Sequence, residues 1–273
     1  MRICPTQYYA YKNNAPDFKS NMREVYKNQN TGDTFAITGP GRIGDAKFLY
    51  SNYTYFFRSG VPTKINGRDW LDFARLIDEE FKDAPHVNIY DFGCSDGSEA
   101  CSIAISLIEA LGEERAQKFF PIIASDADFE IIKNAKEGKF DCTIEDIDAI
   151  DYHTNSNHEK YFDTTDEKHF IYQTLKSKKI LQDNIIFQNE DFISGLDKIQ
   201  GKNNLVICRN FWAYLSPKER EEAIEKLKEK IDSTSFVMID TFDKEKGMNL
   251  EAEGFFEIRN NLYKPRKAVQ KAS

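Results

Sequence analysis

The chain has 273 residues, of which 30% are charged and 40% belong to the hydrophobic set, a balance that fits a folded globular protein with one substantial core. The formal net charge of −8 argues against nucleic acid as a partner, because a protein that binds phosphates normally presents a basic face. The sequence shows no signal peptide and no apolar run of the ~20 residues that cross a bilayer, so we expect a cytoplasmic protein without membrane insertion.

The first 65 residues are predicted to form an arm that contributes to the ligand site, rather than a separate domain. Pro5, Pro16 and the Gly-Pro-Gly turn at 39–41 break any long periodicity. Within this arm a short helix is predicted over residues 18–26. Residues 66–273 are then predicted to form the main domain.

Strand and helix signals alternate from residue 66 onward. Apolar residues at helical spacing predict a helix over 69–81, capped by Asp69. Ser216, Pro217 and Glu219 have the form of an N-cap, a first-turn proline and a capping-box glutamate, so they predict the start of a later helix. Further helices are predicted at 98–111 and 128–136, the second one ended by glycine 138. Strands are predicted at 86–92, 119–125, 184–187, 204–208, 236–240 and 255–263.

This alternation predicts an α/β fold, a mainly parallel sheet with helices on both faces. Such sheets bind ligands at the carboxyl ends of their strands, near the point where the strand order reverses. Residues 141–183 interrupt the alternation, because they are acidic first and then carry short β-like runs at 170–175 and 179–181. We expect them to form a small β-subdomain inserted in the main domain.

The cysteines and histidines show no pattern typical of a metal site or of disulfides. The five cysteines are scattered and form no C-x-x-C pair, and the four histidines have no ligand spacing. The sequence therefore predicts no bound metal and a reducing compartment.

Two segments carry the signals for a ligand. In residues 87–99 a predicted strand runs into Gly93 and Gly97 before a helix, an arrangement that lets the backbone approach a ligand near free helix amides. Asp126 ends the next predicted strand, where a carboxylate can accept hydrogen bonds from both hydroxyls of a ribose. Asp126 or Asp128 could instead cap the following helix. Because the turn lacks a third glycine, an adenosyl ligand is favoured over a dinucleotide.

Five segments, in the same order and at similar spacing, resemble the CheR family of chemotaxis-receptor methyltransferases. Residues 52–58 (N-Y-T-Y-F-F-R) resemble the family's N-x-T-x-F-F-R, and residues 93–99 (G-C-S-D-G-S-E) are similar to its G-C-S-T-G-E-E. Residues 124–128 (A-S-D-A-D) resemble A-S/T-D-I-D, and residues 187–189 more loosely resemble an F…N pair. Residues 207–214 resemble I-F-C-R-N-V-x-I-Y. The resemblance covers about residues 50–264.

The resemblance implies a Rossmann-like class I fold and an S-adenosylmethionine-dependent methyltransferase, with S-adenosylhomocysteine as its product. It further implies that the acceptor is a glutamate carboxylate of a protein, such as a chemoreceptor. Tyr214 and Arg58 are the catalytic candidates, with Tyr214 orienting the incoming carboxylate. The residues implied to bind the cofactor are Asn52, Thr54, Arg58, Gly93, Glu99, Asp126, Asn189, Glu190, Asn210 and Phe211.

Several of these residues have a purely structural alternative. Arg58 could form a surface ion pair, Arg209 could neutralise a neighbouring acid, and Tyr214 could be a packing aromatic. Asn189 or Asn210 could satisfy backbone groups at a strand end. The two phenylalanines at 56 and 57 are interpreted as core residues.

The chain also departs from the family pattern. Asp96, Ser98, Ala100 and Cys101 replace the family's Thr, Glu, Pro and Tyr around the turn, and residues 240–243 replace its G-x-S-E. The leader is shorter than the family's N-terminal helical domain, which helps to engage chemoreceptors. Two alternatives therefore stay open: the same cofactor with a small molecule or a non-chemotaxis protein as acceptor, and a non-catalytic module that binds the cofactor.

Overall fold

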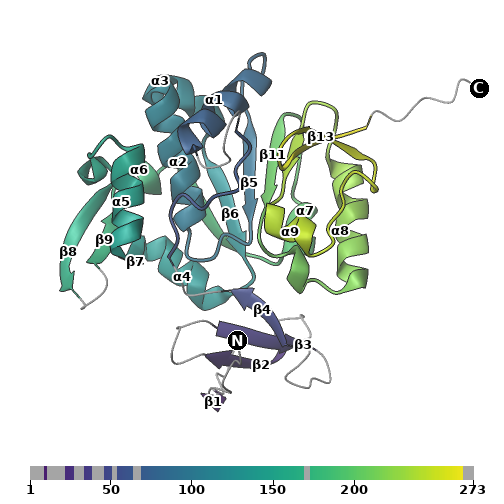
Figure 1. The fold of residues 1–273 in the computed structure, drawn as a ribbon, viewed down its shortest axis with the longest axis horizontal. Helices are drawn as coiled ribbons and strands as arrows, with labels where there is room; N and C mark the ends of the chain where they lie inside the picture. The colour runs from purple at the N-terminus through teal and green to yellow at the C-terminus, as the bar shows by residue number, and fades with distance from the viewer. Residues whose placement is uncertain are drawn as a thin grey trace, which may run out of the picture. The chain divides into compact units, whose positions relative to one another are not determined.

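A computed structural model describes residues 9–10, 22–27, 34–38, 46–50, 54–63, 69–168 and 173–266 (Figure 1). The chain divides into two compact units, Met1–Tyr53 and Thr54–Ser273. None of the helices in the described part of the chain combines the length and the apolar character that crossing a bilayer requires.

The first unit contains a four-stranded antiparallel sheet in the order β1-β2-β3-β4. Its strands are β1 (Tyr9–Ala10), β2 (Met22–Lys27), β3 (Thr34–Thr38) and β4 (Ala46–Tyr50). The helix predicted over 18–26 is therefore wrong, since residues 22–26 pair with β3. The β-forming pair Val25 and Tyr26, followed by the turn-rich sequence N-Q-N-T-G-D at 28–33, was the hairpin signal that the helix prediction overlooked.

The second unit is organised around a seven-stranded sheet in the order β10-β6-β5-β11-β12-β14-β13. The first five strands of this order are parallel, and β14 runs antiparallel to both of its neighbours, β12 and β13. The chain builds outward from β5 to β6 and β10 on one side, and then to β11 and β12 on the other, so the strand order reverses between β5 and β11 (Figure 1). The strands are β5 (Asn88–Phe92), β6 (Ile122–Asp126), β10 (Ile185–Asn189), β11 (Asn204–Cys208), β12 (Phe236–Met238), β13 (Phe255–Arg259) and β14 (Leu262–Pro265).

One predicted strand, 255–263, is in fact a hairpin of two strands. β13 and β14 pair antiparallel around Asn261, whose φ of 67° gives the backbone a left-handed turn. The sequence prediction missed this turn because Asn-Asn, without glycine or proline, is a weak turn signal.

Helices cover both faces of the sheet, as predicted. One apolar cluster holds Ile89 and Leu205 together with α1 and α2, and another holds Tyr90 and Val206 together with α7 and α8. Consecutive strand residues therefore point to opposite, helix-covered faces. The helices of this part are α1 (Trp70–Glu80), α2 (Ser98–Leu111), α3 (Glu113–Ala116), η2 (Gln117–Phe119), α4 (Phe129–Glu137), α7 (Phe192–Leu196), η4 (Trp212–Tyr214), α8 (Pro217–Lys230) and α9 (Thr241–Glu245).

The predicted helix signals at residues 69, 138 and 216 are confirmed. The Asp69 side chain accepts hydrogen bonds from two amides of α1, and Ser216 forms a capping box with Glu219 at the start of α8. Gly138 ends α4 in a left-handed conformation.

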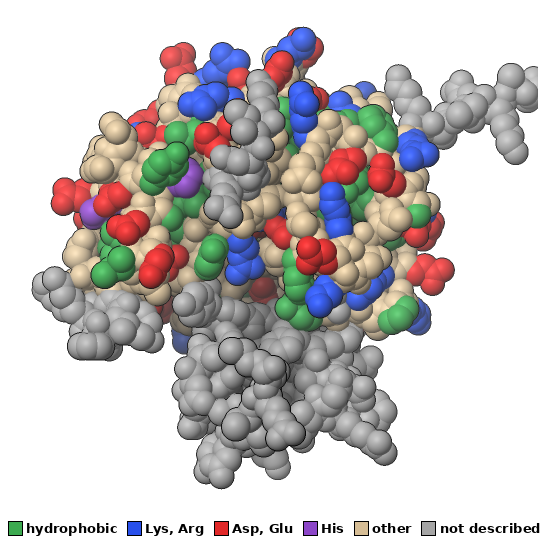
Figure 2. All heavy atoms as spheres, in the orientation of Figure 1, with side chains coloured by type: hydrophobic (Ala, Val, Ile, Leu, Met, Phe, Trp, Pro, Cys, Tyr) green, Lys and Arg blue, Asp and Glu red, His purple; other side chains and the backbone are tan. Residues whose placement is uncertain are grey.

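On the face seen in Figure 2, acidic and basic side chains alternate over the second unit rather than forming one basic surface.

A second, three-stranded antiparallel sheet, in the order β7-β9-β8, lies between α4 and β10 in the sequence. Its elements are β7 (Lys139–Cys142), α5 (Ile144–His153), η3 (His158–Lys160), β8 (Phe162–Lys168), β9 (Gln173–Ser177) and α6 (Lys179–Gln182). The β-like run predicted at 179–181 is wrong, because these residues form the single turn α6. The run Lys179-Ile180-Leu181 has only two apolar residues and is too short for periodicity to separate helix from strand.

Candidate functional site

The turn between β5 and α2 contains two glycines whose backbones only glycine adopts without strain. Gly93 has a φ of +73° and Gly97 a φ of +88°. A Cβ atom on Gly93 would lie 2.8 Å from the ring of Phe211, and one on Gly97 would lie 2.6 Å from the ring of Phe187. Both the backbone conformation and the close packing therefore require glycine at positions 93 and 97, where the turn contacts the rings of Phe211 and Phe187.

Asp126 lies at the carboxyl end of β6, beside this turn. Its side chain is only 5% exposed, and its oxygens accept hydrogen bonds from the Ser95 and Asp128 amides, both at 3.0 Å. Burial raises the pKa of Asp126 to about 6, so the carboxylate is mostly ionised at neutral pH. The cap of α4 is Asp128, which accepts from the amides of Glu130 and Ile131, so Asp126 does not serve as that cap.

Asn189 and Glu190 follow at the end of the neighbouring strand β10. The Asn189 amide donates to the backbone carbonyls of Asp126 and Ala127 at 3.0 and 3.1 Å, which satisfies backbone groups at a strand end. The Glu190 amide also donates to the Asp126 carbonyl, and its carboxylate pairs with Lys198 at 2.5 Å. The structure thus brings both predicted residues next to Asp126.

Arg209 directly follows β11 and is a buried arginine, with a side chain 1% exposed. Its guanidinium pairs with Glu99 at 2.5 Å and with Asp240 at 2.8 Å, and it donates to the Ser59 carbonyl at 2.6 Å. Arg209 therefore neutralises neighbouring acids, and in doing so it joins the start of α2, the ends of β11 and β12, and the segment 54–63. One oxygen of the predicted cofactor residue Glu99 is occupied by this pair.

The segment after Arg209 is held by a residue that the sequence prediction missed, Asp243 in α9. Its fully buried carboxylate accepts from the amide of Asn210 at 2.8 Å, of Asp240 at 3.1 Å and of Trp212 at 3.2 Å. Asn210 adopts a φ of 64° there. The available signal was the spacing of Asp240 and Asp243, which form a capping box at the start of α9.

Aromatic side chains surround Phe211. Its ring lies parallel to that of Trp212, with centroids 5.9 Å apart, and meets Phe192 edge-on at 4.8 Å. Tyr214 lies three residues after Phe211 in the same segment and is half-buried. The predicted residues Asn210, Phe211 and Tyr214 thus share one short stretch between β11 and α8.

The segment 54–58 packs against the start of α2. The Thr54 hydroxyl donates to Asp96 at 2.7 Å. The interpretation of the two phenylalanines as core is confirmed, because Phe56 meets Phe140 with ring centroids 5.2 Å apart and Phe57 stacks on His153 at 3.9 Å. The guanidinium of Arg58 lies 4.9 Å from the centroid of the Tyr55 ring. Asn52, also a predicted cofactor residue, lies outside the described residues.

A second acid that the sequence prediction missed is Asp91 in β5. Its side chain is 1% exposed, and none of the described residues donates a hydrogen bond to either of its oxygens. Burial, and after it the negative charge of Glu99, raises the pKa of Asp91 well above its usual range. The sequence signal was a single acid within the otherwise apolar end of a strand, I-Y-D-F.

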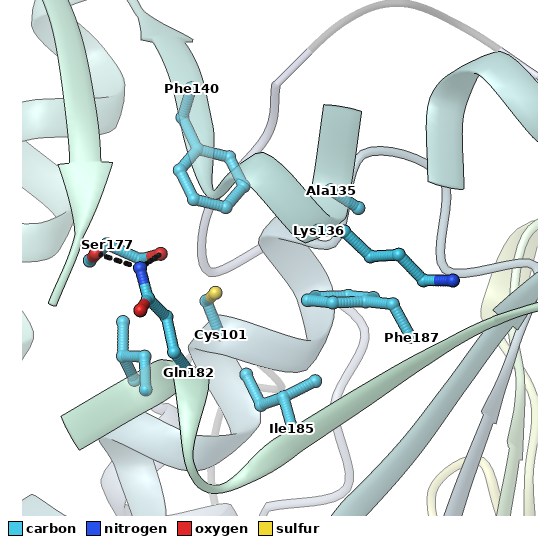
Figure 3. A pocket seen from close by; sticks show the side chains of 9 residues that line it. Cys101, Ala135, Lys136, Phe140, Ser177, Gln182, Ile185 and Phe187 are labelled. Atoms are coloured by element: carbon cyan, nitrogen blue, oxygen red, sulfur yellow. Dashed lines mark hydrogen bonds between the residues drawn. The ribbon is translucent and has the colours of Figure 1, made fainter. Parts of the chain in front are cut away.

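A cavity of about 200 Å³ adjoins the turn on the side of α4 and α6 (Figure 3). Phe187, which packs over Gly97, is one of its walls, and Gln182 donates to the Ser177 carbonyl at another. None of the side chains lining it is a predicted site residue, so this cavity is separate from the group of residues around Asp126. No cluster of acidic, His or Cys side chains among the described residues could hold a metal ion.

Comparisons with known proteins give a match over the part of the chain that contains these residues. The sequence model "CheR methyltransferase, SAM binding domain" matches residues 52–252, more than half of the chain. A chemotaxis protein methyltransferase of Borreliella burgdorferi is 24% identical over 193 residues, which are 70% of this chain and 64% of that relative. The match thus spans slightly less than two thirds of the relative's length.

Solved structures were also compared. PKMT2 from Rickettsia typhi in complex with AdoHcy is 14% identical with a TM-score of 0.33, over 57% of this chain and 21% of that one. Magnesium protoporphyrin IX methyltransferase from Synechocystis PCC 6803 with bound SAM is 15% identical with a TM-score of 0.32, over 69% and 73% of the two chains. The strand order and the sequence family confirm the predicted Rossmann-like class I fold.

Proposed function

The chain belongs to the CheR methyltransferase family, and from this membership we propose that it transfers a methyl group from S-adenosylmethionine to a glutamate carboxylate of a protein. S-adenosylmethionine is the cofactor of the matched domain. The observation that carries the proposal is the family match over residues 52–252. The gathering of acids and amides at the carboxyl ends of β5, β6, β10 and β11 supports it, because this edge is where open α/β sheets bind ligands.

The residues at this edge fit a cationic nucleoside. The oxygens of Asp126 accept hydrogen bonds from the backbone amides of Ser95 and Asp128, and a carboxylate has further acceptor positions that could take a ribose hydroxyl. Asp91 is a buried acid without a described donor, and Asp126 and Glu99 add further negative charge beside it. We assign the cofactor to this edge, with the turn glycines, Thr54 and Arg58 on one side. Asn189, Glu190, Asn210 and Phe211 lie at the neighbouring strand ends.

The proposed reaction needs no strong general base. Bound S-adenosylmethionine supplies an electrophilic methyl group, and a glutamate side chain is already ionised at neutral pH. The contribution of this chain is then alignment and the exclusion of water around the acceptor. Arg58 and Tyr214 are proposed to orient the acceptor carboxylate. The rings of Phe211 and Phe192, which pack on the fully buried Trp212, are proposed to provide an apolar wall.

The test is incubation with methyl-labelled cofactor and candidate acceptor proteins. A glutamate ester gives base-labile label that is released as methanol, and Asp126→Ala should abolish labelling by weakening cofactor binding. Base-stable label would exclude an ester. Tight cofactor binding without transfer to any acceptor would favour a non-catalytic module.

A chemoreceptor is the proposed protein partner, supported by the chemotaxis relative from Borreliella burgdorferi. One observation favours a different acceptor: the first unit is an antiparallel β-sheet, whereas the family's leader is helical. Labelling of small molecules or of non-chemotaxis proteins, with none on receptors, would establish this second candidate. The proposed compartment is the cytoplasm, which suits the free, buried state of the four cysteines in the described part of the chain, at positions 94, 101, 142 and 208.

A further inference from the structure

Asp91 is a buried acid whose two oxygens both lack a hydrogen-bond partner among the described residues. It lies one residue before the end of β5, at the strand edge that carries the proposed cofactor site. Its neighbours on the strand, Tyr90 and Phe92, point to the opposite face of the sheet, so Asp91 points to the face covered by α2. A charged carboxylate this deeply buried is expensive without hydrogen bonds or a cation.

The groups around Asp91 leave it short of positive charge. The charges that act most strongly on Asp91 are those of Glu99 in α2, of Asp126 at the end of β6 and of the cation Arg209. The Asp91 carboxyl in turn acts on the Cys94 thiol of the turn. That cation is already engaged by Glu99 and Asp240. Without a ligand, Asp91 is therefore most stable as the neutral acid, and a cation placed at the turn would favour its ionised form.

We infer that Asp91 is a proton-exchanging counter-charge of the cofactor site, which holds a proton in the free protein and releases it to solvent when the cationic cofactor binds. Only the O–H bond of the carboxyl group breaks, and the proton passes to water or buffer. S-adenosylmethionine has a net charge of +1 from its sulfonium, ammonium and carboxylate groups, whereas the demethylated product has none. Asp91 consequently favours the methylated nucleoside over its product. This inference rests on the proposed function, because it concerns the same site.

The experiment is calorimetric titration of the full chain with S-adenosylmethionine and with S-adenosylhomocysteine, in two buffers of different ionisation enthalpy. A pH of about 7.5 lies above the pKa values of about 6 of Asp126 and Asp243, so these groups contribute little proton exchange. Wild type should release protons when it binds S-adenosylmethionine, and it should release a smaller number of protons per ligand when it binds the product. Asp91→Asn should abolish this difference. It should weaken S-adenosylmethionine on the order of tenfold and the product by less than about threefold.

The control variants distinguish the loss of the Asp91 charge from a general loss of folding. Asp148→Asn removes an exposed acid of α5 and should leave both affinities and the proton count as in wild type. Because a neutral aspartic acid and asparagine have the same shape, Asp91→Asn should keep its thermal midpoint at this pH. Asp91→Ser, whose hydroxyl does not ionise at this pH, serves if the amide variant does not fold.

The outcomes are distinct. Heat of binding that does not depend on the buffer, or an equal loss of affinity for both nucleosides in Asp91→Asn, overturns the inference while leaving the cofactor assignment intact. A wild-type protein that binds neither nucleoside removes the proposed function and this inference together.

Discussion

Asp243 is a buried carboxylate whose two oxygens accept hydrogen bonds from three backbone amides. Burial raises its pKa to about 6, whereas an aspartate in an unfolded chain titrates near about 4. The folded state therefore binds this proton more tightly. The stabilisation linked to the proton is fully present below about pH 4 and is lost as the pH rises through about 6.

We expect the free energy of unfolding to fall by about 1 kcal/mol between about pH 5 and about pH 7 on account of Asp243. Urea unfolding of wild type and Asp243→Asn at both pH values measures this. The variant should be less stable throughout, because an amide has one acceptor oxygen fewer, but its stability should change less with pH. An identical pH dependence in the two proteins would contradict the assignment.

Arg209 allows a second prediction at this scale. Its removal leaves Glu99 and Asp240 as partly buried acids without their cation, so Arg209→Met should lose about 3–5 kcal/mol of stability in urea unfolding. The control Lys133→Met breaks an exposed ion pair and should lose less than about 1 kcal/mol. Adding Asp240→Asn to Arg209→Met should recover part of the loss. Equal stability of the two single variants would refute a structural role for Arg209.

Sequence reasoning at the residue level reached the acids that end strands or follow glycines, and missed two acids that are buried. Asp126 was predictable, because its place after an apolar run fixes it at the edge of the sheet. Asp91 was harder to identify, because the one signal was a single acid in an otherwise apolar strand, and a lone acid has no spacing that marks it as part of a site. The sequence showed Asp243 only as a residue that differs from the family pattern. Its structural role was not predictable, because two of the three amides that donate to it come from another segment, 210–212, and the tertiary fold places them there.

At the level of elements, a substitution in the turn before α2 can show whether Gly97 is required by its backbone conformation alone or also by its close packing. In Gly97→Ala a Cβ would both strain a φ of +88° and meet the Phe187 ring, so we expect a loss of stability larger than the ~1–2 kcal/mol of strain alone, with weaker cofactor binding. Thermal unfolding and calorimetry measure the two effects.

The matched control is Gly254→Ala. Gly254 has a similar φ of +94°, but no atom of the described residues lies within 4 Å of its Cβ position, so this variant reports strain without a clash. Phe187→Leu combined with Gly97→Ala should recover some stability. If the two alanine variants lose the same amount, packing against Phe187 has no effect.

Long elements with regular spacing were predictable, and short ones were not. The helix at α2 and the strand at β11 have the predicted bounds, because each carries an apolar pattern that ends in clear breakers. The residues of β2 and α6 were assigned wrongly, since a few apolar positions fit either period. In the folded protein, β2 is a strand because it pairs with β3. The residues of α6 are helical because the Lys178 carbonyl accepts hydrogen bonds that close the turn.

At the scale of the whole molecule, the position of the cofactor site can be mapped by hydrogen exchange. Added S-adenosylmethionine should slow backbone exchange at the strand ends and turns of the proposed site, because ordering them suppresses local opening. The segments are 93–99, 126–128, 189–190 and 209–214. Residues 144–168 of the insert serve as an internal reference and should exchange as before. Protection confined to 135–140 and 177–187 would instead place the nucleoside in the cavity of Figure 3.

The alternation of strands and helices was enough to predict a mainly parallel sheet and the edge at which ligands bind. The order of the strands was not predictable from that alternation, because the chain could add each new strand on either side of β5. The division after Tyr53 was also hidden, since the hairpin residues that precede it were interpreted as an arm.

The burial of Cys94, Cys101, Cys142 and Cys208 gives the second unit a set of internal chemical probes. Each thiol lies in the core and has a raised pKa, so a thiol-specific reagent reaches it only when the surrounding structure opens. The four positions span β7, β11, α2 and the turn before it. Mass spectrometry of the modified peptides would therefore resolve, without any introduced label, the order in which these regions loosen.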